Sequence, residues 1–417
     1  MSNISEIVNG SPTSVAGFTA CGVTAGFKRS GAPDFAMLYS EDAANCAGVF
    51  TSCRFAAAPV LYDKEILSKP DARIKAVIIN SGIANACTGQ TGLENSRKSA
   101  ALVASKMGIP ADQVAVASTG RIGVQLTMDT LEKGIDLAIP ALSCDGGNDA
   151  SRAIMTTDTV PKAVAFTKEI NGVKVTVGAM TKGAGMIAPD LHGLHATMLC
   201  FITTDVKADN DVLAEILEEC AEESFNRITV DGDMSTNDTV LVLSNGRSNL
   251  EIKSGTPEAA EFKELLLTTM KNLARRMVMD GEGATKFVTV EVVNAKTKED
   301  AALASRAVAD SLLCKTAWFG NDPNWGRVVA ALGYSGAIFD PSKVDVFFGP
   351  LQVVKNGGDA GTPEADLVKV VSEKEFVIRC DFHDGDANHW IWTSDVSYEY
   401  AIVFNPLERT TFCKAEQ

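Results

Sequence analysis

The sequence predicts an α/β protein in which sheets and helices are layered, with a second, smaller α/β domain. Two apolar runs, 77–80 (VIIN) and 114–118 (VAVAS), have the length and the β-branched content of buried strands, and a helical pattern lies between them at Gly92–Met107. This order is typical of a βαβ unit. Because a strand, helix, strand order returns after Asp280, we expect a second domain there.

The length of the chain also favours more than one domain. At 417 residues it is longer than one ordinary core, and a hydrophobic content of 46% is enough to bury two or three. A helical pattern at Glu258–Met279 ends in the glycine-bearing turn DGEGATK, and a new strand pattern follows at Phe287–Val293. We therefore predict a main domain at 1–284 and a smaller C-terminal domain at 285–417.

A β-hairpin is expected around Asn171-Gly172. The segment AVAFTKEINGVKVTVGAM alternates polar and apolar residues on both sides of this dipeptide, which is the strongest short-range hairpin signal. Its second arm leads directly to Lys182. A helical pattern at Ala208–Glu223 and a strand pattern at Val240–Leu243 add further layers to the same domain.

The step from Ala196 to Thr197 has the features of a self-cleavage site. It lies within Lys182–Asp205, where glycines and a proline precede a small residue pair that opens into an apolar run. Such a backbone can hold a peptide bond in an unusual geometry. Attack of the Thr197 hydroxyl on the Ala196 carbonyl would give an ester that water hydrolyses, leaving fragments 1–196 and 197–417. The alternative is that Thr197 is simply the first residue of a strand.

Cleavage there would make Thr197 a self-contained catalytic residue. Its hydroxyl would be the nucleophile and its freed α-amine the general base. The amine suits this role because its unperturbed pKa of roughly 7.7–8.0 lies close to working pH. The expected fold is therefore of the self-processing, N-terminal-threonine type.

Several long motifs in fixed order resemble one known family. In chain order they are NSGIANACTG at Asn80–Gly89, ASTGRIG at Ala117–Gly123, AIMTTDTVPK at Ala153–Lys162, KGAGMIAP with ATML around Thr197, SFNRITVDGDMSTNDT at Ser224–Thr239, DGEGATKF at Asp280–Phe287 and NDPNWGRV at Asn321–Val328. The set covers nearly the whole chain and resembles the ornithine acetyltransferases, also called bifunctional glutamate N-acetyltransferases, of arginine biosynthesis.

The resemblance implies a reaction and an assembly. The acetyl group of N2-acetyl-L-ornithine would pass to L-glutamate by a ping-pong mechanism through an acetyl-threonine, with no cofactor. Acetyl-CoA as a further acetyl donor is left open. The two cleaved fragments would stay associated, as a heterotetramer of two α and two β chains.

The resemblance also implies which residues act. Thr119 and Gly120 of the STG motif would form the oxyanion hole, since a hydroxyl and a backbone N–H after a strand can point at one oxygen; an ordinary strand-end turn is the alternative. The substrate-binding positions would be Thr156, Lys182, Thr197, Glu282, Asn405 and Thr410. Lysine can offset a substrate carboxylate and glutamate can pair with an ammonium group, whereas the neutral side chains fix orientation. For each charged residue the alternative is a solvated surface side chain.

Three departures from the family pattern concern the site. Family members usually run from APN through one apolar residue to ATML, whereas APDLHGLHATML carries additional residues within Leu191–His195. Arg121 stands where a small apolar residue usually follows STG, and NPLERT at Asn405–Thr410 replaces an NADYRT-like ending. The sequence leaves open whether cleavage still occurs, and whether Arg121 and Pro406–Arg409 alter substrate choice. Two alternatives therefore remain: a self-processing amidohydrolase or aminopeptidase, and an uncleaved, non-catalytic relative.

Composition agrees with a cytoplasmic enzyme that acts on small molecules. A net charge of −15 disfavours nucleic acid as a partner, so local cations must hold any anionic substrate. Ten cysteines without a CxxC pair indicate reduced thiols. The residues at positions 1–14 have neither the pattern of a signal core nor that of a transit peptide, and no apolar run reaches the length of a bilayer span, so a cytoplasmic location is expected. His192 and His195 form HxxH without a marked third ligand, so no metal is expected.

Overall fold

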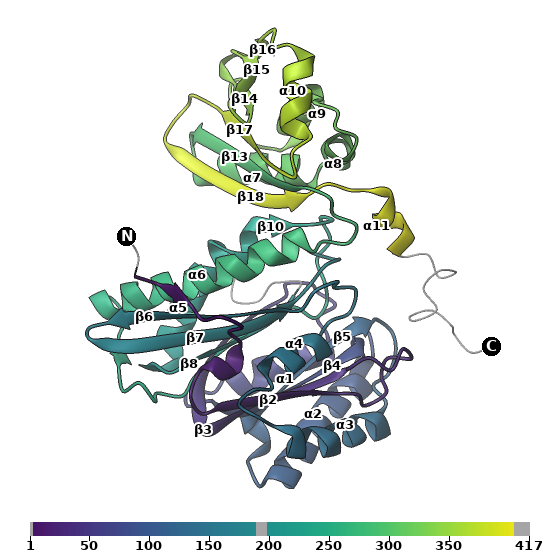
Figure 1. The fold of residues 1–417 in the computed structure, drawn as a ribbon, viewed down its shortest axis with the longest axis vertical. Helices are drawn as coiled ribbons and strands as arrows, with labels where there is room; N and C mark the ends of the chain where they lie inside the picture. The colour runs from purple at the N-terminus through teal and green to yellow at the C-terminus, as the bar shows by residue number, and fades with distance from the viewer. Residues whose placement is uncertain (1–2, 189–197, 404–417) are drawn as a thin grey trace, which may run out of the picture.

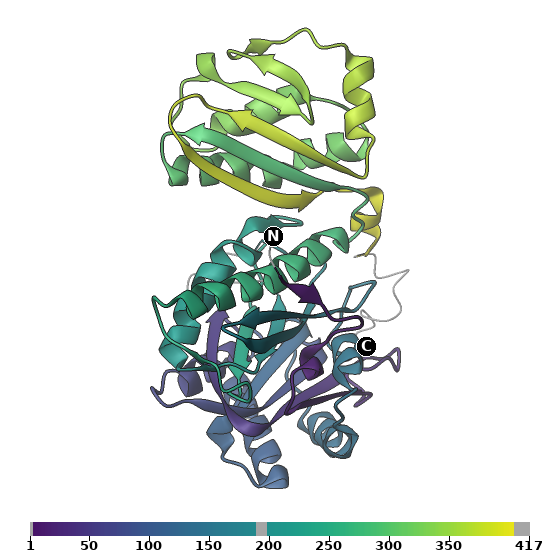
Figure 2. The same ribbon diagram turned by 60° about the vertical axis from the view of Figure 1, so that its left-hand side comes forward.

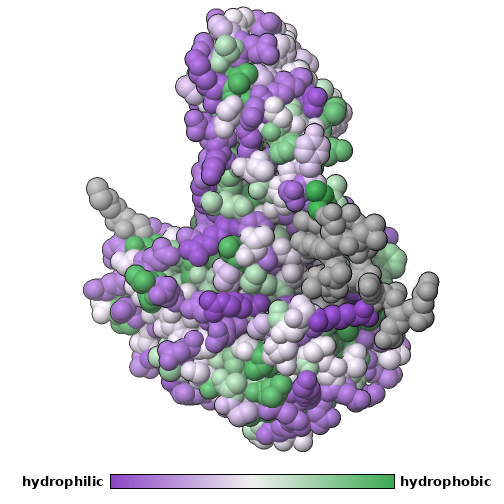
Figure 3. Space-filling view, turned by 45° about the vertical axis from the view of Figure 1, so that its right-hand side comes forward, coloured by the Kyte–Doolittle hydropathy of each residue, from purple (hydrophilic) through white to green (hydrophobic). Residues whose placement is uncertain are grey.

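The computed structural model describes residues 3–188 and 198–403 of the chain. Figure 1 shows a wide main domain with a smaller domain above it, and the space-filling view has the same outline (Figure 3). The main domain carries the N-terminal strands and the helices α1 to α6, and the smaller domain carries α7 to α10 (Figure 1).

The helices and strands have the following bounds. The helices are α1 (Ala58–Leu67), α2 (Gly89–Met107), α3 (Met128–Ala141), α4 (Gly147–Ala153), α5 (Asn210–Glu222), α6 (Pro257–Met279), α7 (Lys298–Asp310), α8 (Leu312–Phe319), α9 (Trp325–Tyr334), α10 (Glu364–Val371) and α11 (Tyr398–Val403). The strands are β1 (Ser5–Glu6), β2 (Phe18–Val23), β3 (Phe35–Phe50), β4 (Arg73–Ile83), β5 (Val114–Arg121), β6 (Lys162–Ile170), β7 (Val173–Lys182), β8 (Leu199–Thr204), β9 (Lys207–Ala208), β10 (Ile228–Thr229), β11 (Thr239–Ser244), β12 (Glu251–Ile252), β13 (Phe287–Ala295), β14 (Asp345–Phe348), β15 (Leu351–Lys355), β16 (Gly358–Asp359), β17 (Glu375–Asp381) and β18 (Ala387–Ser394).

The main domain is built on one sheet in which the long strand β3 exchanges its pairing partners along its length. Over the described ranges its strand order is β1-β6-β7-β8-β11-β3-β4-β5, with β2 also paired to β3. The first part of β3 pairs with β2 and β4, its last part pairs with β11, and the register with β4 shifts between Tyr39 and Ala44. This long strand therefore joins the β4-β5 half of the sheet to the β7-β8 half.

The two faces of β8 lie in different hydrophobic cores. Leu199 and Phe201 pack in the core that also holds side chains of α2 and α3, whereas Cys200 and Ile202 pack in the core that holds α5 and α6. This follows from the alternation of side chains along a strand. The layered α/β fold predicted from the sequence is thus confirmed, with helices outside and sheet strands inside.

The local predictions are confirmed by the elements around the site. The strands β4 and β5 are parallel neighbours joined by α2, as expected for the βαβ unit. The strands β6 and β7 form the predicted antiparallel hairpin, with Ile170 opposite Val173. Asn171 and Gly172 have φ values of 49° and 76°, the positive values that this two-residue turn requires.

The smaller domain has its own sheet and core. Within the described residues its strand order is β10-β18-β13-β17-β14-β15-β16. Figures 1 and 2 both show α6 on the side of the main domain that faces this sheet. Thr256 caps α6 by accepting a hydrogen bond from Ala259 N, and Pro257 occupies its first turn. The division predicted after residue 284 falls between α6 and β13 and stays a prediction, because β10 lies earlier in the chain yet pairs with β18.

None of the described helices is both long and apolar enough to cross a membrane.

Candidate functional site

The candidate site lies where the ends of β5 and β7 meet. Lys182 is the last residue of β7 and pairs with Leu199 at the start of β8. Thr119 lies near the end of β5. The Lys182 Nζ donates a hydrogen bond of 3.4 Å to the Thr119 Oγ1. Two residues that the sequence places 63 positions apart are therefore in direct contact.

Gly120 follows in a backbone conformation that requires glycine. Its φ is +128°, and it pairs with Gly82, whose φ is +118°. A Cβ on Gly120 would lie 2.3 Å from the Gly82 carbonyl carbon, closer than any real contact. A side chain is thus excluded here, both by the close strand and by the positive φ. Gly120 directly follows Thr119 in the chain, and the role of these two residues as the donors of an oxyanion hole stays a prediction.

Lys182 is a buried cation that has no direct carboxylate partner within the described residues. It is 8% exposed, and burial lowers the pKa of its ammonium group, while Asp158 and Glu282 oppose that shift. No ion pair within 4.0 Å joins Lys182 to a carboxylate among the described residues. Such a group gains most from an anionic ligand, because the ligand would supply the missing counter-charge.

A buried ion triad supports the end of β7 from behind. Lys162 donates to Asp158 at 2.8 Å and to Asp280 at 2.5 Å, and its side chain is fully buried. Asp158 also accepts the backbone N–H groups of Thr156 and Gly183, at 3.0 Å and 2.8 Å. Burial alone would raise the pKa of Asp158, but Lys162 and Lys182 together hold it below its usual range. The triad therefore ties three chain segments together beside the site.

Thr156 and Glu282 also lie near the segment that follows Lys182. Thr156 is half-buried, and its position is fixed through Asp158. Glu282 is 6% exposed, its backbone N–H bonds to Ala184 O at 2.8 Å, and its carboxylate lies against Gly185, where a Cβ would approach it to 2.4 Å. The structure thus brings together Thr119, Gly120, Thr156, Lys182 and Glu282. Their catalytic and substrate-binding roles stay predictions.

The other predicted site residues are Ala196, Thr197, Asn405 and Thr410. They lie outside the described residues, as do His192, His195 and the Pro406–Arg409 segment. Arg121 is described and exposed. No group of three or more His, Cys, Asp or Glu side chains that could hold a metal occurs in the part of the chain that the structure describes.

Asp238 is a buried acid that sequence reasoning missed. It is 2% exposed and lies one residue before β11. Burial raises the pKa of Asp238 well above its usual range, an effect that the nearby Lys182 opposes. Its carboxyl group accepts hydrogen bonds from the backbone of Ser235 and of Met198, the residue after Thr197. The motif STNDT contains this aspartate, but no local signal in the sequence shows that it lies near Lys182.

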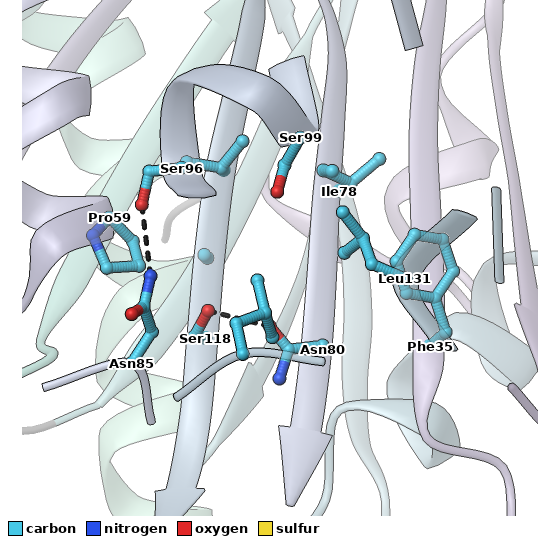
Figure 4. A pocket seen from close by; sticks show the side chains of 12 residues that line it. Phe35, Pro59, Ile78, Asn80, Asn85, Ser96, Ser99, Ser118 and Leu131 are labelled. Carbon is cyan, nitrogen blue, oxygen red and sulfur yellow. Dashed lines mark hydrogen bonds between the residues drawn. The ribbon is translucent and has the colours of Figure 1, made fainter. Parts of the chain in front are cut away.

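A small cavity with a mixed polar and apolar lining lies beside β4 and β5. Its volume is about 10 Å³ and it is lined by Asn80, Asn85, Ser96, Ser99 and Ser118 among other residues, which is room for about one water molecule. Figure 4 shows Ser118 bonded to Asn80 and Asn85 bonded to Ser96. These bonds hold β4, β5 and α2 in register, so the cavity belongs to the support of the site rather than to substrate binding.

Comparisons with known proteins agree on one family. The family model described as the ArgJ family matches residues 19–405. The arginine biosynthesis bifunctional protein ArgJ of Symbiobacterium thermophilum is 46% identical over 401 residues, which cover 95% of this chain and 98% of that protein. The glutamate N-acetyltransferase of Methanocaldococcus jannaschii is 43% identical over 407 residues, which cover 95% and 98%.

One solved structure is also similar to part of the chain. The ornithine acetyltransferase of Mycobacterium tuberculosis, complexed with ornithine, is 44% identical with a TM-score of 0.43, and the match covers 45% of this chain and 100% of that chain. The fold and the site define a layered α/β protein in which the ends of β5 and β7 place a buried lysine in contact with a threonine hydroxyl. The chain belongs to the ArgJ family. The resemblance predicted from the sequence motifs is confirmed.

Proposed function

We propose that the chain is an acetyltransferase of arginine biosynthesis that moves the acetyl group of N2-acetyl-L-ornithine to L-glutamate. The observation that carries the proposal is the family match over residues 19–405, with relatives named as bifunctional ArgJ and as glutamate N-acetyltransferase. The contact of Lys182 with Thr119 gives it a chemical basis, because an anion-holding cation lies beside a donor for an oxyanion.

The first half of the reaction forms an acetyl-enzyme. In the proposal the chain is cleaved between Ala196 and Thr197, and the freed α-amine of Thr197 takes the proton of its own hydroxyl. The oxygen attacks the acetyl carbonyl, Thr119 and Gly120 stabilise the oxyanion, and the amide C–N bond breaks. Ornithine leaves with the proton that the α-ammonium group returns, and the acetyl group remains as a threonine ester.

The second half transfers the acetyl group to glutamate. The neutral amine of glutamate attacks the ester carbonyl, an amide C–N bond forms and the ester C–O bond breaks. The proton that the glutamate amine loses passes through the α-amine of Thr197 to its hydroxyl oxygen. Lys182 holds a substrate carboxylate, Glu282 pairs with the ammonium group of ornithine, and Thr156, Asn405 and Thr410 orient the substrates. No cofactor takes part, since the ester itself carries the acetyl group; acetyl-CoA would be a further donor to the same threonine.

The proposal extends to assembly and location. The fragments 1–196 and 197–417 would remain associated, because β8 pairs on both sides with β7 and β11 and all of its residues are buried. Dimers of this pair would give the heterotetramer. A cytoplasmic location is supported by the nine described cysteines, all of which are free thiols.

The test is the Thr197→Ala variant, with Thr197→Ser as its matched control. We expect Thr197→Ala to remain a single full-length chain by mass spectrometry and to form no acetyl-enzyme with N-acetylornithine. Thr197→Ser keeps a hydroxyl and an α-amine after cleavage, so it should still cleave and transfer. Full transfer activity in uncleaved Thr197→Ala would refute the proposal. Release of free acetate without acetylglutamate in the wild type would instead indicate a hydrolase.

A further inference from the structure

A second lysine lies close to the site on a loop that the sequence did not mark. Lys28 belongs to the connection between β2 and β3. The carboxylate of Asp34 anchors this loop by accepting the backbone N–H groups of Ala25, Gly26 and Lys28, at 2.7 Å, 3.1 Å and 2.8 Å. Three bonds to one carboxylate fix the loop firmly, so Lys28 projects from an ordered base.

The anchored loop packs against Gly82 of β4, the strand next to the one that carries Thr119 and Gly120. The Phe27 carbonyl oxygen would lie 3.2 Å from a Cβ on Gly82, and Gly82 pairs with Gly120. Lys28 is thus one residue from a backbone contact with the strand beside the proposed oxyanion hole. Its Nζ donates to Pro33 O at 2.7 Å and lies 3.5 Å from Ala153 O, in the segment that leads to Thr156.

Two charged groups of the candidate site, Asp158 and Lys182, also act on Lys28. Burial lowers the pKa of the Lys28 ammonium group to about 8, Asp34 and Asp158 act in the opposite direction, and Lys182 lowers it further. The effect of Lys182 is the smallest of these, and it places the two lysines in the same electrostatic environment. Neither makes an ion pair with a carboxylate among the described residues, whereas Lys162, in the same cluster, has two.

Two cations in one region, neither paired with a carboxylate in the part of the chain that the structure describes, form a suitable place for one anion. The backbone carbonyls that Lys28 contacts satisfy hydrogen bonds but do not neutralise its charge. A carboxylate placed between Lys28 and Lys182 would relieve their repulsion and accept a hydrogen bond from each. An α-carboxylate is the one anionic group that ornithine, N-acetylornithine and glutamate share.

We infer that Lys28 is a substrate-binding residue, which together with Lys182 holds the α-carboxylate of the amino-acid substrates. The inference rests on the proposed function for the identity of these substrates. Because the same carboxylate is present in both half-reactions, Lys28 should affect N-acetylornithine and glutamate alike. Side-chain groups of the substrates would be recognised elsewhere, with the ornithine ammonium at Glu282.

A binding experiment tests the inference without requiring turnover. The purified, full-chain protein is titrated with ornithine and with ornithinamide, which lacks the α-carboxylate, and the midpoint of thermal unfolding is followed. Wild type should be stabilised by ornithine at concentrations at least 10-fold lower than by ornithinamide. In Lys28→Gln the difference between the two ligands should shrink to about threefold or less. If Lys28→Gln still prefers ornithine as strongly as wild type does, the inference is wrong.

The matched control is Arg29→Gln, which removes the same charge from the next, exposed residue. It should bind both ligands as wild type does. An equal loss in both variants would show a general effect of charge and would overturn the specific role of Lys28. If ligand discrimination depends on Lys28 but no acetyl transfer occurs, the carboxylate site stands and the proposed function fails.

Steady-state kinetics separate binding from a purely structural role. In Lys28→Gln the KM for both substrates should rise roughly 10- to 100-fold, the range expected for one charge-assisted hydrogen bond, while kcat changes much less. In wild type the KM should rise above pH 8, where Lys28 loses its proton, and Lys28→Arg should remove that rise because arginine stays charged. A loss of kcat at constant KM, or an increase in the KM for glutamate alone, contradicts the assignment.

Discussion

Replacement of Lys162 by methionine tests how the site is supported. The Lys162 side chain is completely buried, and its ammonium group is the common partner of Asp158 and Asp280. Methionine fills a similar volume without charge. Two buried carboxylates would then face each other without the cation between them, although backbone N–H groups would still bond to each.

The expected loss of stability is large. Removing one partner of a buried ion pair costs about 3–5 kcal/mol, because the remaining charge stays desolvated and unpaired. For a domain of this size, roughly 2 °C of midpoint shift accompanies each kcal/mol, so the unfolding midpoint of the main domain should fall by about 6–10 °C. Transfer activity should fall as well, because Asp158 positions the backbone of Thr156 and Gly183 beside Lys182.

Differential scanning calorimetry of the purified protein measures this effect, with Lys168→Met as control. Lys168 lies on the same strand, and its own side chain is 5% exposed, but its partners Glu261 and Glu264 are 44% and 48% exposed. Water can solvate those glutamates after the change, so the control should cost only about 0–1 kcal/mol. If Lys162→Met lowers the midpoint by less than about 2 °C, or by no more than Lys168→Met does, the triad does not stabilise the domain.

Three further outcomes follow from the same geometry. Gly120→Ala should lose about 10²–10³ in kcat, because the added Cβ would collide with Gly82. The control is Gly123→Ala, which also has a positive φ but has open space around it, and it should retain activity. Equal rates in the two variants would refute the oxyanion assignment. The pKa of Asp158 is held below its usual range, so the stability that its carboxylate contributes is complete above about pH 4 and is lost as the pH falls further. The unfolding free energy of Asp158→Asn should therefore fall less on acidification than that of wild type. An equal fall in the two proteins would contradict this prediction. Lys182→Met should raise the KM for glutamate by roughly 10- to 100-fold, and an unchanged KM would remove Lys182 from substrate binding.

Local patterns in the sequence were sufficient for the strands and the hairpin around the site. The apolar runs at 77–80 and 114–118 became β4 and β5, and Asn171-Gly172 became the turn between β6 and β7. These predictions succeeded because the side-chain periodicity of a strand and the positive φ of a turn are properties of neighbouring residues.

The contacts within the site depend on chain segments that are distant in sequence, and no local pattern reports them. Lys162 and Asp280 are 118 positions apart, and only the packing of α6 against the hairpin brings them together. The motifs predicted roles for Thr156 and Glu282. The buried acids two positions away in the same motifs, Asp158 and Asp280, form the ion triad with Lys162. A lysine in a glycine-containing loop does not belong to a periodic pattern, so the sequence alone gives no signal that Lys28 lies near the site.

The structure also resolves a conflict between the overall charge and the proposed substrates. A chain with net charge −15 repels glutamate at long range, but this repulsion between solvated charges is screened beyond about 8–10 Å in physiological salt. In the proposed complex, Lys182 and Lys28 would act on the substrate inside that distance and in a partly desolvated environment, where each charge interacts more strongly than in water. Asp158 and Asp280 are both paired with Lys162, whereas Lys182 and Lys28 form no ion pair with a carboxylate among the described residues. A strongly acidic protein can therefore hold an acidic substrate, because the local cations, rather than the total charge, determine the potential at the site.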